Sequence, residues 1–139
     1  MEIRKINETI SVAPQINPDD MAKVAEMGFR TVIGNRPDGE VPGQPASSEM
    51  EEAARNAGLA YRFVPVISGQ LTRENVDEFG ATMADVEGPV LAFCRSGTRS
   101  ATLWALSQAG RMPSEEIIGQ AAAAGYDMAP FRTVLDGKG

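Results

Sequence analysis

The architecture expected for this chain depends on the stretch Pro89-Val90-Leu91-Ala92-Phe93-Cys94-Arg95-Ser96-Gly97-Thr98-Arg99-Ser100. Residues 89–93 form a short, continuously apolar run, which is typical of a strand buried on both faces of a parallel sheet. Residues 101–106 have the pattern of a helix, which Gly110 ends. A short polar loop with one glycine joins the two. The stretch therefore predicts a strand, a tight loop and the start of a helix.

The loop between this strand and helix has the chemistry of an anion site. Its backbone N–H groups and the positive end of the helix dipole converge on one point, where they favour negative charge. Arg95 and Arg99 add full positive charges, and Arg99, at the helix entrance, is expected to face the anion. Ser100 has two candidate roles, a hydrogen bond to the Cys94 sulfur or a helix cap. The residues predicted to bind substrate here are Arg95, Ser96, Gly97, Thr98 and Ser100.

Cys94 is the only cysteine in 139 residues, and it opens this loop. A lone cysteine is often just a small buried apolar residue. Here, however, it follows a buried strand at the carboxyl edge of the predicted sheet, where α/β folds place their ligands. Helix N-termini and neighbouring arginines favour the thiolate, which is the nucleophilic form of cysteine. We therefore predict that Cys94 and Arg99 are catalytic.

The charge distribution narrows the partners that we expect. A formal net charge of −6 argues against general binding of nucleic acid or anionic membranes. Residues 88–114 nevertheless contain no Asp or Glu and include Arg95, Arg99 and Arg111. An acidic protein with one basic pocket suits a small anionic substrate. The length predicts a single domain over residues 1–139.

Missing residue types exclude several kinds of chemistry. The chain has no histidine, which excludes Cys-His and Ser-His-Asp catalysis and leaves only carboxylates as metal ligands beside one thiol. No metal or other cofactor is therefore expected. One cysteine excludes an internal disulfide and fits a reducing compartment. Because no apolar run is long enough to span a membrane and the N-terminus lacks an apolar signal core, we expect a cytoplasmic protein without membrane insertion. The sequence leaves the oligomeric state open.

Strand and helix patterns alternate along the rest of the chain, with a proline- and glycine-rich loop over residues 34–45. The predicted fold class is α/β, with a mostly parallel central sheet flanked by helices. Besides the strand at 89–93, strands are predicted over 3–6, 10–13, 31–33 and 59–64. Besides the helix after the cysteine, helices are predicted over 17–27, 48–58, 72–88 and 113–125, with a last short helix from Asp127.

The residues at 94–100 resemble the active-site loop of single-domain rhodaneses, which are sulfurtransferases. A longer pattern, made of Gln15, residues 34–40 and this loop, resembles the bacterial beta-lactamase hydrolase-like family, whose fold is that of dual-specificity phosphatases. This second resemblance covers nearly the whole chain. It implies a cysteine-phosphatase-like architecture, with Cys94 as nucleophile and residues 95–100 around the oxyanion. In that family the domain occurs alone or fused to persulfide-processing enzymes, which implies a link to sulfide metabolism.

The loop departs from the cysteine-phosphatase pattern of cysteine, five residues and arginine, usually with histidine before the cysteine. Here Phe93 precedes Cys94, Arg99 comes one residue early, and Ser100 takes the arginine position. Phosphatases of this fold usually place an aspartate general acid in the loop that corresponds to residues 67–70. No carboxylate is present there, although the leaving alkoxide needs a proton.

Arg36 and Asp38 follow the carboxyl end of the strand predicted at 31–33. They are predicted to line the same cleft, Arg36 as a substrate-binding residue and Asp38 as the remaining candidate for the catalytic acid. The alternative is that residues 37–39 only form a turn, because proline, aspartate and glycine suit turns well.

These departures make sulfur transfer the first functional hypothesis. The Cys94 thiolate would attack the outer sulfur of thiosulfate or a persulfide, whose leaving group is already a stable anion, so no acid is needed. A thiol acceptor would then take the sulfur from the Cys94 persulfide. The first alternative is a cysteine-dependent phosphatase, a hydrolase of the protein tyrosine or dual-specificity type that acts through a Cys94 phosphocysteine. The second is a non-catalytic anion-binding or redox-sensing module.

Overall fold

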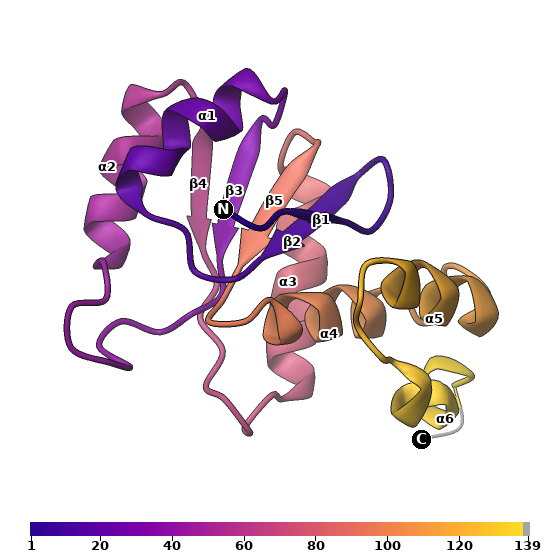
Figure 1. The fold of residues 1–139 in the computed structure, drawn as a ribbon. Coiled ribbons are helices and arrows are strands. Elements are labelled where there is room, and N and C mark those ends of the chain that lie inside the picture. Colours follow the sequence, from indigo (N-terminus) through magenta and orange to yellow (C-terminus); the bar gives the residue numbers. More distant parts are fainter. Residues whose placement is uncertain (138–139) are drawn as a thin grey trace.

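The computed structural model describes residues 1–137 and has a central five-stranded sheet with helices on both faces (Figure 1). The strands lie in the order β1-β2-β5-β3-β4, and only β1 runs antiparallel to its neighbour. This topology confirms the predicted α/β class with a mostly parallel sheet. The strands are β1 (Arg4–Lys5), β2 (Ile10–Ala13), β3 (Thr31–Gly34), β4 (Ala60–Phe63) and β5 (Val90–Phe93).

The helices cover the two faces of the sheet unequally (Figure 1). One face is covered by α1 (Met21–Glu26), which a 3-10 turn, η1 (Pro18–Asp20), precedes, and by α2 (Ser47–Asn56). On the other side lie α3 (Arg73–Asp85) and α4 (Thr98–Ser107). The helix α5 (Ser114–Ala123) packs against α4, and α6 (Arg132–Leu135), with η2 (Ala129–Phe131) before it, packs against α4 and α5. Each face has its own apolar cluster, so the sheet separates two cores.

The central strand β5 contributes side chains to both cores. Val90 and Ala92 lie in the cluster with α3 and α4, whereas Leu91 and Phe93 lie in the cluster with α1 and α2. All four residues are buried. This explains why the sequence of β5 is continuously apolar, since each successive side chain faces a helix layer.

Register brings the loops after three parallel strands to one edge of the sheet. Phe93, the last residue of β5, pairs with Ala13 on β2 and with Gly34 on β3. The residues that follow these three positions therefore meet in space. Cys94 is one of them, and the residues after β2 and β3 supply its neighbours.

Some predicted boundaries differ from the structure. The predicted strand at 3–6 is reduced to Arg4–Lys5, and the predicted strand at 59–64 to Ala60–Phe63. Because β4 is an edge strand, Phe63 is 40% exposed, while Val64 just beyond it is buried. The predicted helix at 72–88 ends at Asp85, since Val86 is already extended. The last predicted helix is divided into η2 and α6.

Candidate active site

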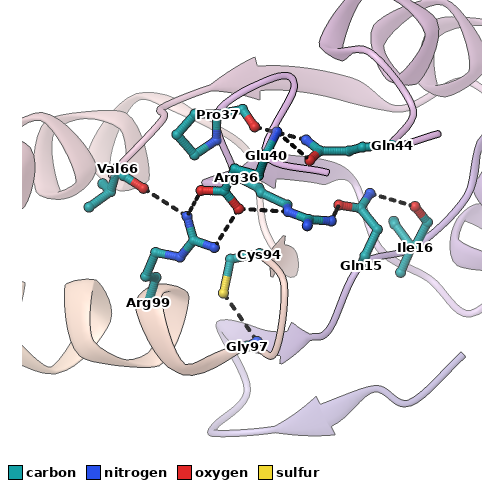
Figure 2. A network of polar contacts seen from close by, with 10 residues as sticks. All are labelled: Gln15, Ile16, Arg36, Pro37, Glu40, Gln44, Val66, Cys94, Gly97 and Arg99. Atoms are coloured by element: carbon teal, nitrogen blue, oxygen red, sulfur yellow. Dashed lines mark hydrogen bonds and ion pairs between the residues drawn. The ribbon is translucent and has the colours of Figure 1, made fainter. Parts of the chain in front are cut away.

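Cys94 begins the loop that joins β5 to α4 (Figure 2). The Gly97 N–H donates to the Cys94 sulfur at 3.1 Å, and the Cys94 N–H donates to the Ala13 carbonyl at 3.3 Å. A backbone N–H directed at sulfur is suited to a negatively charged sulfur. Cys94 has no exposed surface, so a substrate reaches the sulfur only after neighbouring side chains move.

Gly97 sets the shape of this loop. It is the N-cap residue of α4 and has φ of 92°, in the left-handed region that favours glycine. A Cβ atom at this position would lie 2.2 Å from the Tyr126 hydroxyl. On either side, the Ser96 hydroxyl donates to Thr98 Oγ1 at 3.1 Å and accepts the Thr98 N–H at 3.4 Å. Arg95 is exposed, as expected for a side chain at the rim of the loop.

Arg99 reaches across the loop to Glu40 (Figure 2). Its Nη1 donates to Glu40 Oε2 at 2.7 Å and to the Val66 carbonyl at 2.9 Å, and its Nη2 donates to Glu40 Oε1 at 2.9 Å. These bonds use one edge of the guanidinium. The Nε–H and the second Nη2–H take part in none of these three bonds, and together they form a second, bidentate edge. Hydrogen bonds to Glu40 raise the pKa of Arg99, burial lowers it, and the nearby Cys94 raises it further.

Arg36 shares the Glu40 carboxylate with Arg99. The Arg36 side chain is buried; its Nε donates to Glu40 Oε1 at 2.8 Å and its Nη1 to Gln15 Oε1 at 3.1 Å. Hydrogen bonds from Arg99, and to a lesser degree from Arg36, lower the pKa of Glu40 to about 2, although partial burial acts in the opposite direction. Glu40 is therefore ionised at neutral pH. Arg36 therefore belongs to the site, and it is joined to Arg99 through the Glu40 carboxylate that both arginines bond.

Ser100 has neither of its two predicted roles. Its hydroxyl donates to Asn35 Oδ1 at 2.8 Å, so it bonds neither the Cys94 sulfur nor the helix end. Asn35 in turn donates its side-chain N–H to the Val64 carbonyl at 2.8 Å and its backbone N–H to the Phe93 carbonyl at 2.8 Å. Both Asn35 and Ser100 are completely buried. Ser100 thus ties α4 to the end of β3, and its contact with substrate stays a prediction.

Asp38 makes its hydrogen bonds to the start of α2 and not to the Cys94 loop. Its carboxylate accepts the Ser47 backbone N–H and the Ser47 hydroxyl, each at 2.8 Å. Because Ser47 is the first residue of α2, Asp38 acts here as a cap at the start of that helix. The turn interpretation of residues 37–39 accounts for this placement, whereas the role of Asp38 as a general acid stays a prediction.

Two residues of the site were not singled out from the sequence, Glu40 and Asn35. Glu40 lies inside the segment 34–40 that carried the family resemblance, yet its partner Arg99 is 59 residues away. Asn35 directly follows a buried strand, and a polar residue there is a weak signal of a buried hydrogen-bond network. Only the fold shows what the two side chains bond to.

A mostly parallel α/β sheet, with a lone cysteine on a strand-loop-helix turn and an arginine beside it, is the arrangement of the cysteine-phosphatase-like class. More narrowly, the chain belongs to the family described as Beta-lactamase hydrolase-like protein, phosphatase-like domain, whose model matches residues 2–111. The predicted family and the predicted phosphatase-like architecture are both confirmed.

Individual relatives agree with this assignment. The Beta-lactamase hydrolase-like protein of Xylella fastidiosa (strain 9a5c) is 42% identical over 138 residues, which are 98% of this chain and 32% of that protein. The chain thus spans about a third of the length of the curated relatives it matches. None of the helices within residues 1–137 combines the length and the apolar character needed to cross a membrane.

Solved structures are similar over nearly the whole chain. The crystal structure of a candidate phosphatase from Neisseria meningitidis Z2491 matches with a TM-score of 0.85 at 35% identity, over 100% of this chain and 99% of that one. A candidate phosphatase from Shewanella putrefaciens CN-32 matches with a TM-score of 0.75 at 20% identity, over 96% and 87% of the two chains. The second likeness shows the shared fold.

The comparisons overturn the prediction of sulfur transfer. The phosphatase-like family and the Neisseria structure support the alternative, a cysteine-based phosphatase, and give no support to a rhodanese-like sulfurtransferase. The expectation of an enzyme is confirmed, and the cysteine-based phosphatase is the option that these findings favour. The short motif was misleading because residues 94–100 describe only an anion site beside a thiol, and both reactions need one. The thiol acceptor was predicted only as part of the sulfur-transfer hypothesis, so it is not proposed again.

Proposed function

We propose that this domain hydrolyses phosphate monoesters through a phosphocysteine on Cys94. The observation that carries the proposal is the position of the Cys94 sulfur, at the start of α4 and 3.1 Å from the Gly97 N–H, with the guanidinium of Arg99 beside the same loop. A phosphoryl group bound there would meet loop N–H groups, the positive end of a helix dipole and a cation.

The reaction divides into two steps. In the first, the Cys94 thiolate attacks phosphorus, the bond from phosphorus to the ester oxygen breaks, and the leaving oxyanion takes a proton from solvent. In the second, water attacks the phosphocysteine, the P–S bond breaks, and inorganic phosphate and the thiolate are released with the water's proton. Loop N–H groups and the second edge of the Arg99 guanidinium, the one that does not bond Glu40, would hold the equatorial oxygens in both steps.

The placement of the nearby carboxylates supports one class of substrate. Glu40 is ionised at neutral pH and held by two arginines, and Asp38 is held by Ser47. Both carboxylates are engaged in these bonds, so we propose that the reaction proceeds without a proton from either of them. Aryl phosphates, whose phenols leave as weaker bases than alcohols, are therefore the favoured substrates.

Release of phosphate from para-nitrophenyl phosphate tests the proposal, with an alkyl monoester, glycerol phosphate, as the matched poor substrate. Wild-type protein is expected to hydrolyse the aryl ester faster, and Cys94→Ser to fall to the level of buffer. Intact-protein mass after rapid acid quenching should show one phosphoryl group on the wild type and none on Cys94→Ser. Binding of inorganic phosphate without turnover of any aryl ester would reject the proposal and favour an anion-binding module.

A further inference from the structure

Tyr126 contacts the Cys94 loop from the segment that follows α5. It lies beyond residues 2–111, the part that the family model matches. Its hydroxyl donates to the Ser96 carbonyl at 3.3 Å, and the residue is only 8% exposed. A buried tyrosine hydroxyl usually has a hydrogen-bond partner. Here that partner is backbone of the loop that holds the candidate nucleophile.

The peptide group that Tyr126 contacts is the one that faces the sulfur. The Ser96 carbonyl and the Gly97 N–H belong to the same peptide unit, and in a planar trans peptide these two groups point in opposite directions. Tyr126 bonds the carbonyl end, while the N–H end donates to the Cys94 sulfur. A hydrogen bond to the carbonyl fixes the plane and polarises the N–H on the other side.

Gly97 packs directly against the same hydroxyl. A Cβ atom built on Gly97 would lie 2.2 Å from the Tyr126 hydroxyl oxygen and 3.1 Å from the carbon that bears it. The tyrosine therefore limits the loop sterically as well as through a hydrogen bond. Loop and tyrosine fit each other only with glycine at this position.

Contacts on its other side hold Tyr126 in place. Its N–H donates to the Ala121 carbonyl at 2.9 Å, and the Arg4 guanidinium lies 5.9 Å from the centre of its ring. Arg4 also donates to the Ala124 carbonyl at 3.3 Å. Burial raises the pKa of Tyr126, so the hydroxyl keeps the proton that it donates. The ring thus joins β1, the end of α5 and the Cys94 loop.

We propose that Tyr126 is a positioning residue, whose hydroxyl orients the Ser96–Gly97 peptide so that its N–H points at the sulfur and at an oxyanion bound there. This inference rests on the proposed function in so far as the oxyanion is a phosphoryl group. It makes the segment after α5 part of the active-site structure, although that segment supplies no group that touches the substrate.

Tyr126→Phe tests the role of the hydroxyl, because it keeps the ring and removes only the hydrogen bond. Titration calorimetry with inorganic phosphate should show binding about three- to tenfold weaker than in the wild type. The Gly97 amide signal in a ¹H–¹⁵N spectrum should shift, and the melting temperature should change little. Tyr61→Phe, the same change at the other tyrosine, should leave phosphate binding and the Gly97 signal as in the wild type. Unchanged binding in Tyr126→Phe would overturn the inference.

A double-mutant cycle with Gly97→Ala supplies a second test. Gly97→Ala should weaken phosphate binding more than tenfold, since it adds a Cβ atom against the hydroxyl at a positive φ. The loss should be smaller when Tyr126→Phe is also present, because the clashing oxygen is gone. Additive losses would show that the two residues act separately and would overturn the inference. If wild-type protein binds no phosphate at all, the proposed function fails instead, and the Gly97 amide shift still decides whether Tyr126 orients the peptide.

Discussion

Two loops meet at the carboxyl edge of the sheet, and different kinds of contact hold them. The Cys94 loop (residues 94–97) is short and is held mainly through its backbone. The Gly97 N–H donates to the Cys94 sulfur, the Cys94 N–H donates to the Ala13 carbonyl, and the Ser96 carbonyl accepts the Tyr126 hydroxyl. The Glu40 loop (residues 35–46) is long and held by side chains; Gln44, for example, donates to the Pro37 carbonyl at 2.8 Å and accepts the Glu40 N–H at 3.1 Å. Bonds to the backbone thus hold the reactive loop, whereas bonds between side chains and from side chains, including those from Arg99 to Glu40, hold the loop that supports it.

Substitutions in the two loops should therefore have different effects on turnover and on folding. A change at the Cys94 loop should affect turnover more than folding, because this loop supplies the donors to the substrate. A change at the Glu40 loop should affect folding at least as much, because its side chains join β3, α2 and α4. Arg99 belongs to α4, which begins directly after the Cys94 loop, and it bonds Glu40 in the other loop.

The largest effect is expected for Arg99→Lys. Lysine keeps the charge but loses the planar fork that bonds Glu40 on one edge and would bind phosphoryl oxygens on the other. Loss of one such donor group lowers kcat/KM by about 10²–10³-fold. The measurement is steady-state hydrolysis of para-nitrophenyl phosphate, with Arg73→Lys, an exposed arginine at the start of α3, as the control. Equal kcat/KM in the two variants would contradict a role of the guanidinium in the reaction.

Glu40→Gln, a change in the other loop, should lower the unfolding free energy and change how that free energy depends on pH. The folded pKa of Glu40, about 2, lies below its ordinary value of 4.5, so the folded state favours the carboxylate. Its contribution is present above about pH 4.5 and is lost as the pH falls toward 2. The variant leaves buried Arg36 without its ionic partner and should cost about 2–3 kcal/mol of unfolding free energy at pH 7.

Urea unfolding of Glu40→Gln between pH 7 and pH 2.5 measures this effect. The wild type should lose stability between pH 4.5 and 2.5 more steeply than the variant. Glu116→Gln, an exposed glutamate on α5, serves as the control and should follow the wild-type profile. Parallel pH profiles of wild type and Glu40→Gln would show that the arginine pair does not stabilise the folded carboxylate.

The smallest effect is expected for Asp38→Asn. Asparagine can still accept a hydrogen bond from Ser47 at the start of α2, so the loss of unfolding free energy should be at most about 1 kcal/mol. The ratio of rates on para-nitrophenyl phosphate and glycerol phosphate should stay as in the wild type. A selective loss of activity on glycerol phosphate would instead show that Asp38 moves over the sulfur and acts as the general acid.

The difference between local patterns and contacts between distant residues explains how much of the structure could be predicted from sequence alone. The strand at 89–93, the glycine in the loop and the helix after it all have local signatures, so the surroundings of Cys94 were predicted in outline. The pairing of Arg99 with Glu40 was not predicted, because no periodicity links residues 59 positions apart. Tyr126 was missed for the same reason, since its contact with Ser96 depends on how α5 packs.

Local sequence patterns predicted the surroundings of Cys94 better than they predicted the reaction. Cys94 and its neighbours identify a thiol in an anion site, and this is common to sulfur and phosphoryl transfer. What separates the two is the surrounding chain, through the family match over residues 2–111. Asp38 shows the related difficulty, since a carboxylate after a strand can be an acid or a cap, and its hydrogen bonds to Ser47 depend on where α2 begins.

The burial of Cys94 has a practical consequence. It is the chain's only thiol, has no exposed surface, and follows a strand that is paired on both sides. A bulky thiol reagent can react with it only when the structure opens. A labelling rate that is insensitive to denaturant would report local opening around the loop, and a rate that rises steeply with denaturant would report unfolding of the whole sheet. The labelling rate of the Cys94 thiol therefore measures how often the structure opens, and the dependence of that rate on denaturant measures how much of the structure opens.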